Sequence, residues 1–338
     1  MDKIGVFISA YNAEKTLAKT LESVLTQTYQ NFEIYLADNG STDKTFEIVK
    51  DYSKRFDSIV CYRHQKNQTG SFMSTLYGLC NKENYDVTLY YKYDEAGHET
   101  PIIRKCADWL CFIDSDDTLQ PTYLEDLLHF AKENQLDMAM CGWDFVRPNR
   151  VDHRVSEKDE VIYHQDFAVK LPDYDKFMGP IWNKLFRYES LIRNLPYYED
   201  KFSRLFKDGV YFYGADTAFN YFYLGNALDK FGILAKSLYC YQISEESVSR
   251  KHFHPMRIIA DRRMAEVRFD FLQEIGEKIT EENREFILNI YFKSINATMD
   301  LLLHDERYNL KEKMMYLQKM FHYKLMEDAF FQEREQYL

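Results

Sequence analysis

The stretch Trp109-Leu-Cys-Phe-Ile113, followed at once by Asp114-Ser115-Asp116-Asp117, sets the organisation of the chain. Five apolar residues in a row fit a strand that is buried on both faces of a parallel sheet. Three carboxylates follow where this strand ends, and open α/β sheets bind ligands beyond the carboxyl ends of their strands. Because carboxylates this close repel one another, we expect a hard cation, Mg²⁺ or Mn²⁺, to bind them. An acidic turn that only caps the next helix is the alternative.

The composition indicates a folded protein that does not bind nucleic acid. The chain has 338 residues and is 46% apolar, which suggests two units or one domain with a large addition. Its net charge of −11 argues against DNA or RNA as a partner, although a nucleotide bound through a metal stays compatible with it. No signal peptide is visible, and none of the six cysteines forms a C-x-x-C pair. We therefore expect a cytoplasmic protein, with peripheral contact at the inner face of the membrane as a further expectation.

Three short apolar runs, at residues 4–8, 32–37 and 59–62, alternate with helical patterns before the opening stretch. This β-α-β-α-β order predicts a mostly parallel α/β sheet flanked by helices, of the Rossmann-like kind. Asn12 stands before a helical pattern that carries Leu17 and Leu21, so we expect it to be the N-cap of that helix.

The remaining chain divides into two parts. Residues 81–105 are irregular and read as an insertion at the rim of the sheet, and a last strand is expected at residues 237–243. Beyond about residue 255 glycine and proline nearly vanish and the periodicity is helical. We therefore expect a nucleotide-binding α/β domain at residues 1–254 and a C-terminal helical region at residues 255–338.

Polar turns follow three of the predicted strands, at residues 9–12, 38–43 and 114–117. Taken singly, these turns could serve only packing, capping or chain reversal. Because the carboxyl ends of parallel strands meet at one edge of a sheet, together they predict a nucleotide pocket beside a metal site.

Three motifs in this order carry a family resemblance: Ile8-Ser-Ala-Tyr-Asn12, Ala37-Asp-Asn-Gly-Ser-Thr-Asp43 and Phe112-Ile-Asp-Ser-Asp-Asp117. They resemble the family 2 glycosyltransferases of the GT-A fold, over roughly residues 3–250. The resemblance implies an inverting transfer of one sugar from a nucleotide diphosphate donor, with UDP-hexoses the first expectation, to an acceptor hydroxyl. A glycan, glycolipid or glycoprotein acceptor in bacterial surface glycan synthesis is implied with it.

The resemblance also implies roles for individual residues. The residues that would contact the nucleotide are Ser9, Tyr11, Asp38, Asn39, Asp114 and Ser115. The residues that would reach the Mn²⁺ or Mg²⁺ ion are Asp116 and Asp117. Asn39 departs from the family's usual Asp at its position, which leaves the identity of the donor open.

The attacking hydroxyl must lose its proton, so a carboxylate base is needed. In the family this base lies in a Glu-Asp or similar motif, and Gly214-Ala215-Asp216 is the matching place, with Ala215 where many members carry Glu. We therefore expect Asp216 to be the base. A helix N-cap before Thr217 is the alternative role, and Asp208 is a weaker rival.

Two further segments resemble parts of the family's site. Trp182 and Lys184 match a segment that shapes the acceptor side, although a core tryptophan and a solvated lysine are the simpler interpretation. Arg250 lies where a loop could close over the diphosphate, or it belongs to a solvated charged loop. The Gln-x-x-Arg-Trp motif of processive synthases is absent, which favours the transfer of one sugar per encounter.

Alternatives stay open at this point. Asp114-Ser-Asp-Asp-Thr118-Leu119 is similar to the motif of haloacid dehalogenase phosphatases, although Asp117 replaces its glycine. A non-catalytic scaffold with a glycosyltransferase-like fold is another alternative. The aromatic C-terminal helices are expected to pack on the catalytic domain or a second subunit, as in a homodimer, or to contact a membrane surface.

Overall fold

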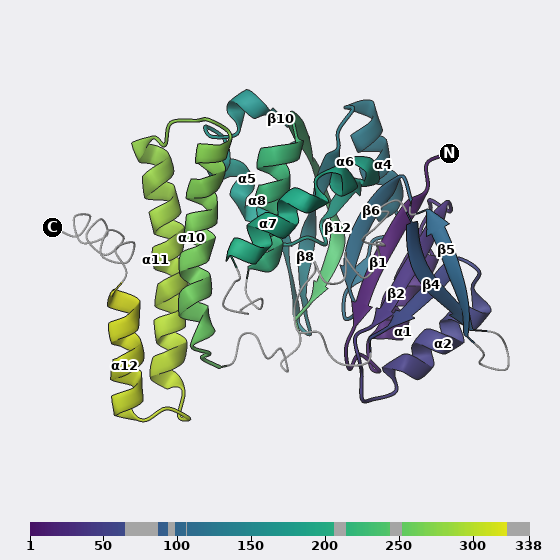
Figure 1. Cartoon of the computed structure of the whole chain (residues 1–338), viewed down its shortest axis with the longest axis horizontal. Coiled ribbons are helices and arrows are strands. Elements are labelled where there is room, and N and C mark those ends of the chain that lie inside the picture. The colour runs from purple at the N-terminus through teal and green to yellow at the C-terminus, as the bar shows by residue number, and fades with distance from the viewer. Residues whose placement is uncertain (65–86, 94–98, 106, 206–213, 244–251, 323–338) are drawn as a thin grey trace. The chain divides into compact units, whose positions relative to one another are not determined.

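In the computed structural model, the strands of the described residues join one sheet (Figure 1). The described residues are 1–64, 87–93, 99–105, 107–205, 214–243 and 252–322. The strands are β1 (Ile4–Ala10), β2 (Phe32–Asp38), β3 (Ile59–Arg63), β4 (Val87–Tyr93), β5 (Glu99–Lys105), β6 (Trp109–Asp114), β7 (Thr118–Leu119), β8 (Met138–Arg147), β9 (Arg150–Arg154), β10 (Glu160–Tyr163), β11 (Lys184–Arg187) and β12 (Lys230–Gln242).

The main path of the sheet runs β10-β12-β8-β11-β6-β1-β2-β3-β4-β5. The strands β6, β1, β2 and β3 run parallel to one another, and β12 is parallel to β8. The short strand β11 is antiparallel to both β6 and β8, which it separates. β4 and β5 form an antiparallel hairpin beside β3, within the segment predicted to be an insertion at the rim.

Helices accompany this sheet and continue beyond it. The helices that start before residue 200 are α1 (Leu17–Leu25), α2 (Thr45–Arg55), α4 (Tyr123–Glu133), α5 (Leu171–Met178), α6 (Tyr188–Arg193) and α7 (Leu195–Leu205), together with the 3₁₀ turn η1 (His164–Asp166). The later ones are α8 (Ala215–Ala227), α10 (Met256–Glu274), α11 (Glu281–His304) and α12 (Leu310–Phe321). The sequence also predicts a helix at residues 72–80, which lie outside the described residues. The predicted fold class, a mostly parallel central sheet flanked by helices with a C-terminal helical region, is confirmed.

The residues separate into two compact units. The first unit holds the sheet and comprises Met1–Tyr163, Pro180–Tyr197 and Ala227–Ile243. The second unit comprises His164–Gly179, Tyr198–Asn226 and Ser244–Leu338, so α5 and α8 group with the C-terminal helices. A domain boundary at residue 254 stays a prediction.

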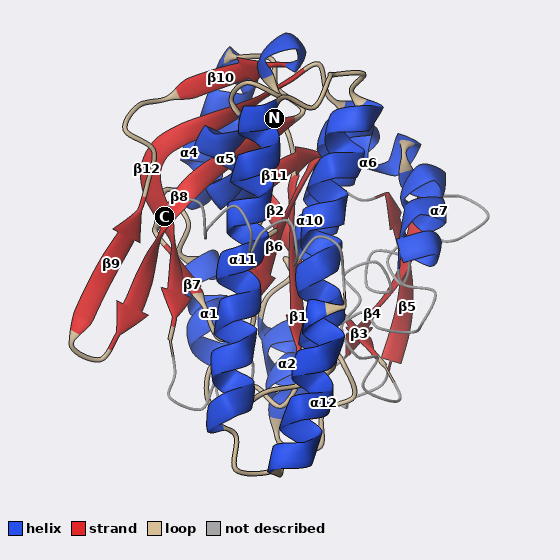
Figure 2. Cartoon of the chain, turned by 90° about the vertical axis from the view of Figure 1, so that its left-hand side faces the viewer, coloured by secondary structure: helices blue, strands red, loops and turns tan. Residues whose placement is uncertain are grey.

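The central strands form where they do because their apolar residues are buried on both faces. β1, β2 and the first five residues of β6 are almost entirely buried. α4 adds Leu124, Leu127 and Leu128, which are buried where this helix packs against β8 and β12. Figure 2 shows β8 and β9 as a hairpin that extends from this sheet.

In the second unit, long helices pack directly on one another. α10 and α11 run side by side in both views (Figures 1 and 2). α11 begins at a Thr280 N-cap, whose side chain accepts a hydrogen bond from the Asn283 N–H at 3.1 Å. The periodicity of the sequence predicts helices at residues 256–275 and 281–303, so the bounds of α10 and α11 agree with it to within a residue.

Candidate active site

The predicted turns meet at the carboxyl ends of three neighbouring strands. Ser9 of β1 stands opposite Asp114 of β6, and Ala10 stands opposite Asp38 of β2. On the other side of β2, Asp38 stands opposite Arg63 of β3. Register alone therefore places two carboxylates and a guanidinium group along one edge of the sheet.

The first two turns are joined by hydrogen bonds between them. The Asn12 N–H donates to Ser41 Oγ at 3.0 Å, and Asn12 Oδ1 accepts from the Thr42 N–H at 2.9 Å. Asn12 has a φ of 49°, in the left-handed region that asparagine tolerates. The expectation that Asn12 caps the following helix is therefore wrong, because α1 begins only at Leu17 and the side chain of Asn12 stabilises the neighbouring turn instead.

Asp38 is a fully buried carboxylate at the centre of this edge. Its Oδ1 accepts a hydrogen bond from the Ser41 N–H at 3.1 Å. Its Oδ2 lies 3.1 Å from Nε of Arg63, but no group among the described residues donates a well-oriented hydrogen bond to this oxygen. The Arg63 guanidinium is held 3.8 Å above the ring of Phe46. A buried acceptor with an unused lone pair, next to a cation, is suited to an N–H donor from a ligand.

Tyr11 and Asn39 flank Asp38. Tyr11 is 45% exposed, so its aromatic side chain is accessible to a planar ligand. The Asn39 N–H donates to the carbonyl of Ala10 at 2.7 Å, which fixes the backbone next to β1. Gly40 then takes a φ of 73°, a conformation that few other residues adopt easily.

The acidic turn, residues 114–117, is closed by a hydrogen bond from the Asp117 N–H to the carbonyl of Asp114 at 3.2 Å. Asp114 and Asp116 are exposed and Ser115 is half-buried. The carbonyl of Ser115 accepts from Thr20 Oγ1 of α1 at 3.0 Å. The turn therefore presents two carboxylates to solvent from a backbone that is held in place.

Asp117 is fully buried and faces β12. Its Oδ1 accepts from the Gln242 N–H and its Oδ2 from the Tyr239 hydroxyl, each at 2.7 Å. Burial raises the pKa of Asp117 to about 7, and the neighbouring Asp116 carboxylate adds to this rise, which the two hydrogen bonds oppose. The side chain of Asp116 is exposed, but nearby protein atoms partly desolvate its carboxylate and raise its pKa as well. Sequence reasoning did not single out Tyr239 or Gln242, which lie over 120 residues from Asp117 in the chain.

The donor set of the turn fits a hard divalent cation. Asp114 and Asp116 offer exposed carboxylate oxygens at the sheet edge. Among the described residues no group of three or more His, Cys, Asp and Glu side chains is placed to hold a metal ion. Mg²⁺ is often held by only one or two carboxylates together with substrate phosphates, so a diphosphate would complete the coordination. Metal binding by Asp116 and Asp117 stays a prediction.

Trp182 belongs to an aromatic stack beside the acidic turn, formed by Trp143, Trp182, Tyr239 and Tyr241. Its ring is stacked on Tyr239, with centroids 4.1 Å apart and planes 14° apart. Trp143 meets Trp182 edge to face at 5.1 Å. Trp182 is only 7% exposed, so most of its surface is committed to this stack.

Lys184 is fully buried in β11. Its ammonium group donates to Asn183 Oδ1 at 2.8 Å and to the carbonyl of Pro180. The Asn183 amide in turn donates to the carbonyl of Cys141 at 3.0 Å. Contact between Lys184 and a diphosphate or acceptor would require its ammonium to leave these partners, and the predicted role stays a prediction.

Asp216 lies in the first turn of α8 in the second unit and is half-buried. The helix is held by Thr217 Oγ1, which donates to the carbonyl of Gly179 at 3.2 Å, and by the Asn220 amide, which donates to that of Met178 at 2.7 Å. Its role as base stays a prediction. Arg250 and the rival base Asp208 lie outside the described residues.

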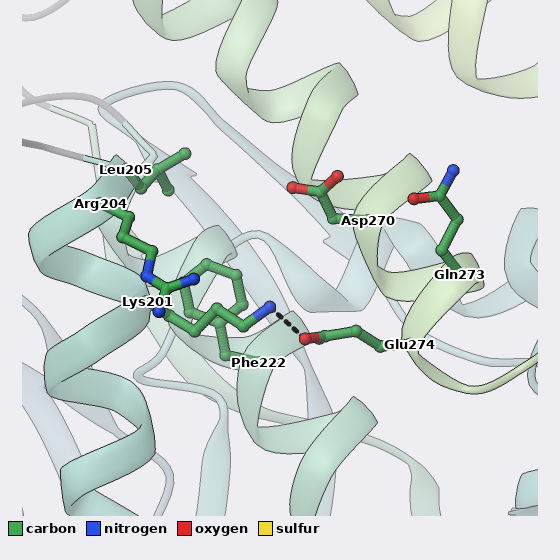
Figure 3. A pocket seen from close by; sticks show the side chains of 7 residues that line it. All are labelled: Lys201, Arg204, Leu205, Phe222, Asp270, Gln273 and Glu274. Carbon is green, nitrogen blue, oxygen red and sulfur yellow. Dashed lines mark hydrogen bonds and ion pairs between the residues drawn. The ribbon is translucent and has the colours of Figure 1, made fainter.

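The second unit also contains a cleft of about 480 Å³ between α7 and α10 (Figure 3). Its lining residues are Lys201, Arg204, Leu205, Phe222, Asp270, Gln273 and Glu274. Lys201 pairs with Glu274 across the cleft, and Arg204 pairs with Asp200 at 2.9 Å. The cleft contains none of the residues that the sequence predicted, and its charges are largely paired with one another.

No helix in the described part of the chain is both long enough and apolar enough to cross a membrane.

The chain is similar to several known glycosyltransferases. The chain is 32% identical to the glycosyltransferase GlyA of Streptococcus pneumoniae serotype 4 over 142 residues, which are 42% of this chain and 17% of GlyA. It is 25% identical to the uncharacterized glycosyltransferase EpsJ of Bacillus subtilis over 260 residues, which cover 75% of this chain and 64% of EpsJ. The chain thus spans less than two thirds of either relative.

The crystal structure of S. aureus TarS 1-349 in complex with UDP-GlcNAc is similar in fold. Its TM-score is 0.54 at 19% identity, and the match covers 98% of this chain and 92% of TarS 1-349. This likeness confirms the predicted fold. The model of glycosyl transferase family 2 matches residues 5–79 and 106–195, which include all three strand-end turns. The chain therefore belongs to glycosyl transferase family 2.

Proposed function

We propose that the chain is a metal-dependent, inverting glycosyltransferase that moves one hexose from a UDP-sugar to an acceptor hydroxyl. One observation carries this proposal. The buried Oδ2 of Asp38 lies beside Arg63 at the same sheet edge as the exposed carboxylates of Asp114 and Asp116. A recognition site for a base and a binding site for a charged diphosphate thus share one edge.

The Asp38 edge suits uracil. A uracil imide has one N–H between two carbonyls, so the N–H can donate to Asp38 Oδ2 while a carbonyl accepts from Arg63. The exposed face of Tyr11 can cover the base, as aromatic rings do in many nucleotide sites. Ser9 and Asn39 would border the nucleoside. TarS was crystallised with UDP-GlcNAc, which is consistent with a UDP donor for this fold.

The acidic turn would hold the diphosphate. Asp114, with Ser115, would face the ribose, and Asp116, supported by Asp117, would hold a Mn²⁺ or Mg²⁺ ion. When bound, the ion would neutralise charge on the departing nucleoside diphosphate. Asp116 suits direct contact because it is exposed, whereas both Asp117 oxygens already accept hydrogen bonds from β12.

The acceptor needs a base on the side of the sugar opposite the leaving group. Asp216 would take the proton of the acceptor hydroxyl as its oxygen attacks the anomeric carbon from that side and the nucleoside diphosphate leaves from the other, so the configuration is inverted. Trp182 and Arg250 would contribute to the acceptor and diphosphate sides. The absence of a Gln-x-x-Arg-Trp motif supports one transfer per encounter rather than processive synthesis.

We further propose a cytoplasmic enzyme that acts on a glycan, glycolipid or glycoprotein in bacterial surface glycan synthesis. α12 leaves Leu310, Met314 and Phe321 exposed, at 77%, 50% and 45%. These apolar side chains support contact of α12 with a second copy or with a membrane surface.

Asp38→Asn tests the proposed binding site for the uracil nucleobase. The Ser41 N–H needs an acceptor, so the amide oxygen of the variant is expected at the Oδ1 position. Its NH₂ group would then face the imide N–H of uracil. We expect UDP affinity, measured by calorimetry with Mn²⁺, to fall by about 10- to 100-fold.

Asp51→Asn is the matched control, because Asp51 is an exposed carboxylate on α2 that pairs with Arg55 at 3.0 Å. Its affinity for UDP should equal that of the wild type. Equal affinities for Asp38→Asn and the wild type would contradict the proposal that Asp38 binds uracil.

Asp216→Asn tests the catalytic base. UDP release from UDP-hexoses with Mn²⁺ should fall by about 10²- to 10⁴-fold, since the variant cannot accept the proton. Its affinity for UDP should stay unchanged. The control is Asp200→Asn, which alters an exposed carboxylate on α7 of the same unit. Release at the wild-type rate by Asp216→Asn would mean that another group is the base.

A further inference from the structure

Tyr239 connects the two ends of the acidic turn through a single hydroxyl. This hydroxyl donates to Asp117 Oδ2 at 2.7 Å and lies 3.2 Å from the Asp114 N–H, from which it accepts a hydrogen bond. Tyr239 is fully buried. The hydroxyl therefore contacts both the residue that begins the turn and the residue that ends it, while Asp114 and Asp116 point to solvent.

The strand that carries Tyr239 holds the following residues as well. β12 pairs with β7, with Tyr239 opposite Leu119. The Gln120 N–H donates to the carbonyl of Leu238 at 2.9 Å, and the Gln242 N–H donates to Asp117. The last residue of the acidic turn and the residues that follow it are thus attached to β12.

This attachment matters because the turn concentrates negative charge. Asp114, Asp116 and Asp117 repel one another, and an unsupported backbone would let the exposed carboxylates move apart. The Tyr239 hydroxyl opposes such movement at both ends of the turn. Removing the hydroxyl would leave one buried Asp117 oxygen without its donor.

The ring of Tyr239 is itself fixed by packing. Trp182 stacks on one of its faces, with centroids 4.1 Å apart. Tyr123 approaches it edge to face, with centroids 6.4 Å apart. A hydroxyl on a ring this constrained can hold its two partners at a set distance.

We propose that Tyr239 is a positioning residue for metal-dependent nucleotide binding, which acts through Asp117 and the Asp114 N–H on the exposed carboxylates. It would not touch the nucleotide or the ion. The inference rests on the proposed function of the acidic turn. It adds a residue of β12, the last strand in the sequence, to a site otherwise built from residues at the ends of β1, β2 and β6.

Tyr239→Phe tests this inference because it keeps the ring and the stack and removes only the hydroxyl. UDP binding is measured by calorimetry over a Mn²⁺ series, and melting temperature is recorded in parallel. We expect the Mn²⁺ concentration at half-maximal UDP affinity to rise about 10- to 100-fold, as for other groups that orient metal ligands. UDP binding without Mn²⁺ should stay unchanged.

Tyr123→Phe is the matched control. Tyr123 is equally buried and touches the same ring, but its hydroxyl donates to the carbonyl of Trp182 at 2.8 Å and not to the acidic turn. It should lose a similar amount of thermal stability without a change in Mn²⁺ dependence.

The outcomes separate the two proposals. If wild-type protein binds UDP with Mn²⁺ and Tyr239→Phe shows the same Mn²⁺ dependence, the positioning role is wrong and the proposed function stands. An equal shift in Tyr123→Phe would show general loosening and would also overturn the role. Wild-type protein that binds no UDP with Mn²⁺ would overturn the proposed function, and this inference with it.

Discussion

Two buried carboxylates, Asp117 in the acidic turn and Asp305 at the end of α11, are held by hydrogen bonds from groups of different charge. Asp117 receives its bonds from a hydroxyl and a backbone N–H. Asp305 accepts from the N–H groups of Phe253 and Arg307, at 3.1 and 3.0 Å, and also from the Arg307 guanidinium. Among the described residues, a cationic side chain donates a hydrogen bond to Asp305 but not to Asp117.

The difference reverses the direction of the pKa shift. Burial raises the pKa of Asp117, so folding favours its neutral form and this stabilisation fades as pH rises from about 4 to 7. Hydrogen bonds from Arg307 hold the pKa of Asp305 well below its usual range, so its stabilisation is complete near neutral pH and fades in acid. A carboxylate at the acidic turn therefore gains most from a cation that arrives with a ligand, whereas Asp305 has no such need.

The largest expected effect comes from removing a cation inside the second unit. Arg268 and Asp175 form a buried pair, with Nη2 3.1 Å from Oδ2, and Tyr221 donates to the same carboxylate. Arg268→Leu would leave Asp175 with neutral hydrogen-bond donors, which is the situation of Asp117. Because that charge stays buried, we expect the free energy of unfolding to fall by about 3–5 kcal/mol in urea titrations.

The matched control is Arg193→Leu, which breaks an exposed pair with Glu189 at 2.8 Å. Exposed pairs contribute about 0–1 kcal/mol, so this variant should unfold nearly as the wild type does. Similar losses of stability in Arg268→Leu and Arg193→Leu would show that the buried cation contributes no more than an exposed one. That result would contradict the contrast between carboxylates with and without a cationic partner.

A smaller effect is expected from Asp305→Asn. The amide keeps an acceptor for the Phe253 N–H but loses its charge, so the variant should lose more stability at pH 7 than at pH 3, where Asp305 of the unfolded chain is already largely protonated. Urea midpoints at the two pH values measure this. Asp300→Asn, an exposed change on α11 beside His304, serves as the control. A loss that is equal at both pH values would show that the ion pair does not set the acid sensitivity.

The parts of the molecule that sequence predicted well are those with local signals. The three strand-end turns and the bounds of α10 and α11 follow from apolar runs, turn residues and helical periodicity. Strand β11 was not predicted, because four residues carry too little pattern to show a strand inserted between β6 and β8. β9, β10 and α5 were not predicted either, because each is too short to show a clear period.

Site residues were predictable where a motif marked them and not where distant chain segments meet. Asp38 and Asp114 were identified from turns that follow buried strands. Arg63, Tyr239 and Gln242 become visible only once β3 and β12 take their places in the sheet. Membership of glycosyl transferase family 2 decides against the haloacid dehalogenase alternative.

The edge-to-face contact between Trp143 and Trp182 gives the molecule an optical reporter. Two indole rings with centroids 5.1 Å apart, at 87° to each other, couple their electronic transitions and contribute a paired band to the circular dichroism spectrum. The chain has only three tryptophans, so few other indole pairs can form. Trp182 also stacks on Tyr239. Changes in the band on addition of UDP and Mn²⁺ would therefore show, without any label, whether binding at the acidic turn reaches the aromatic stack.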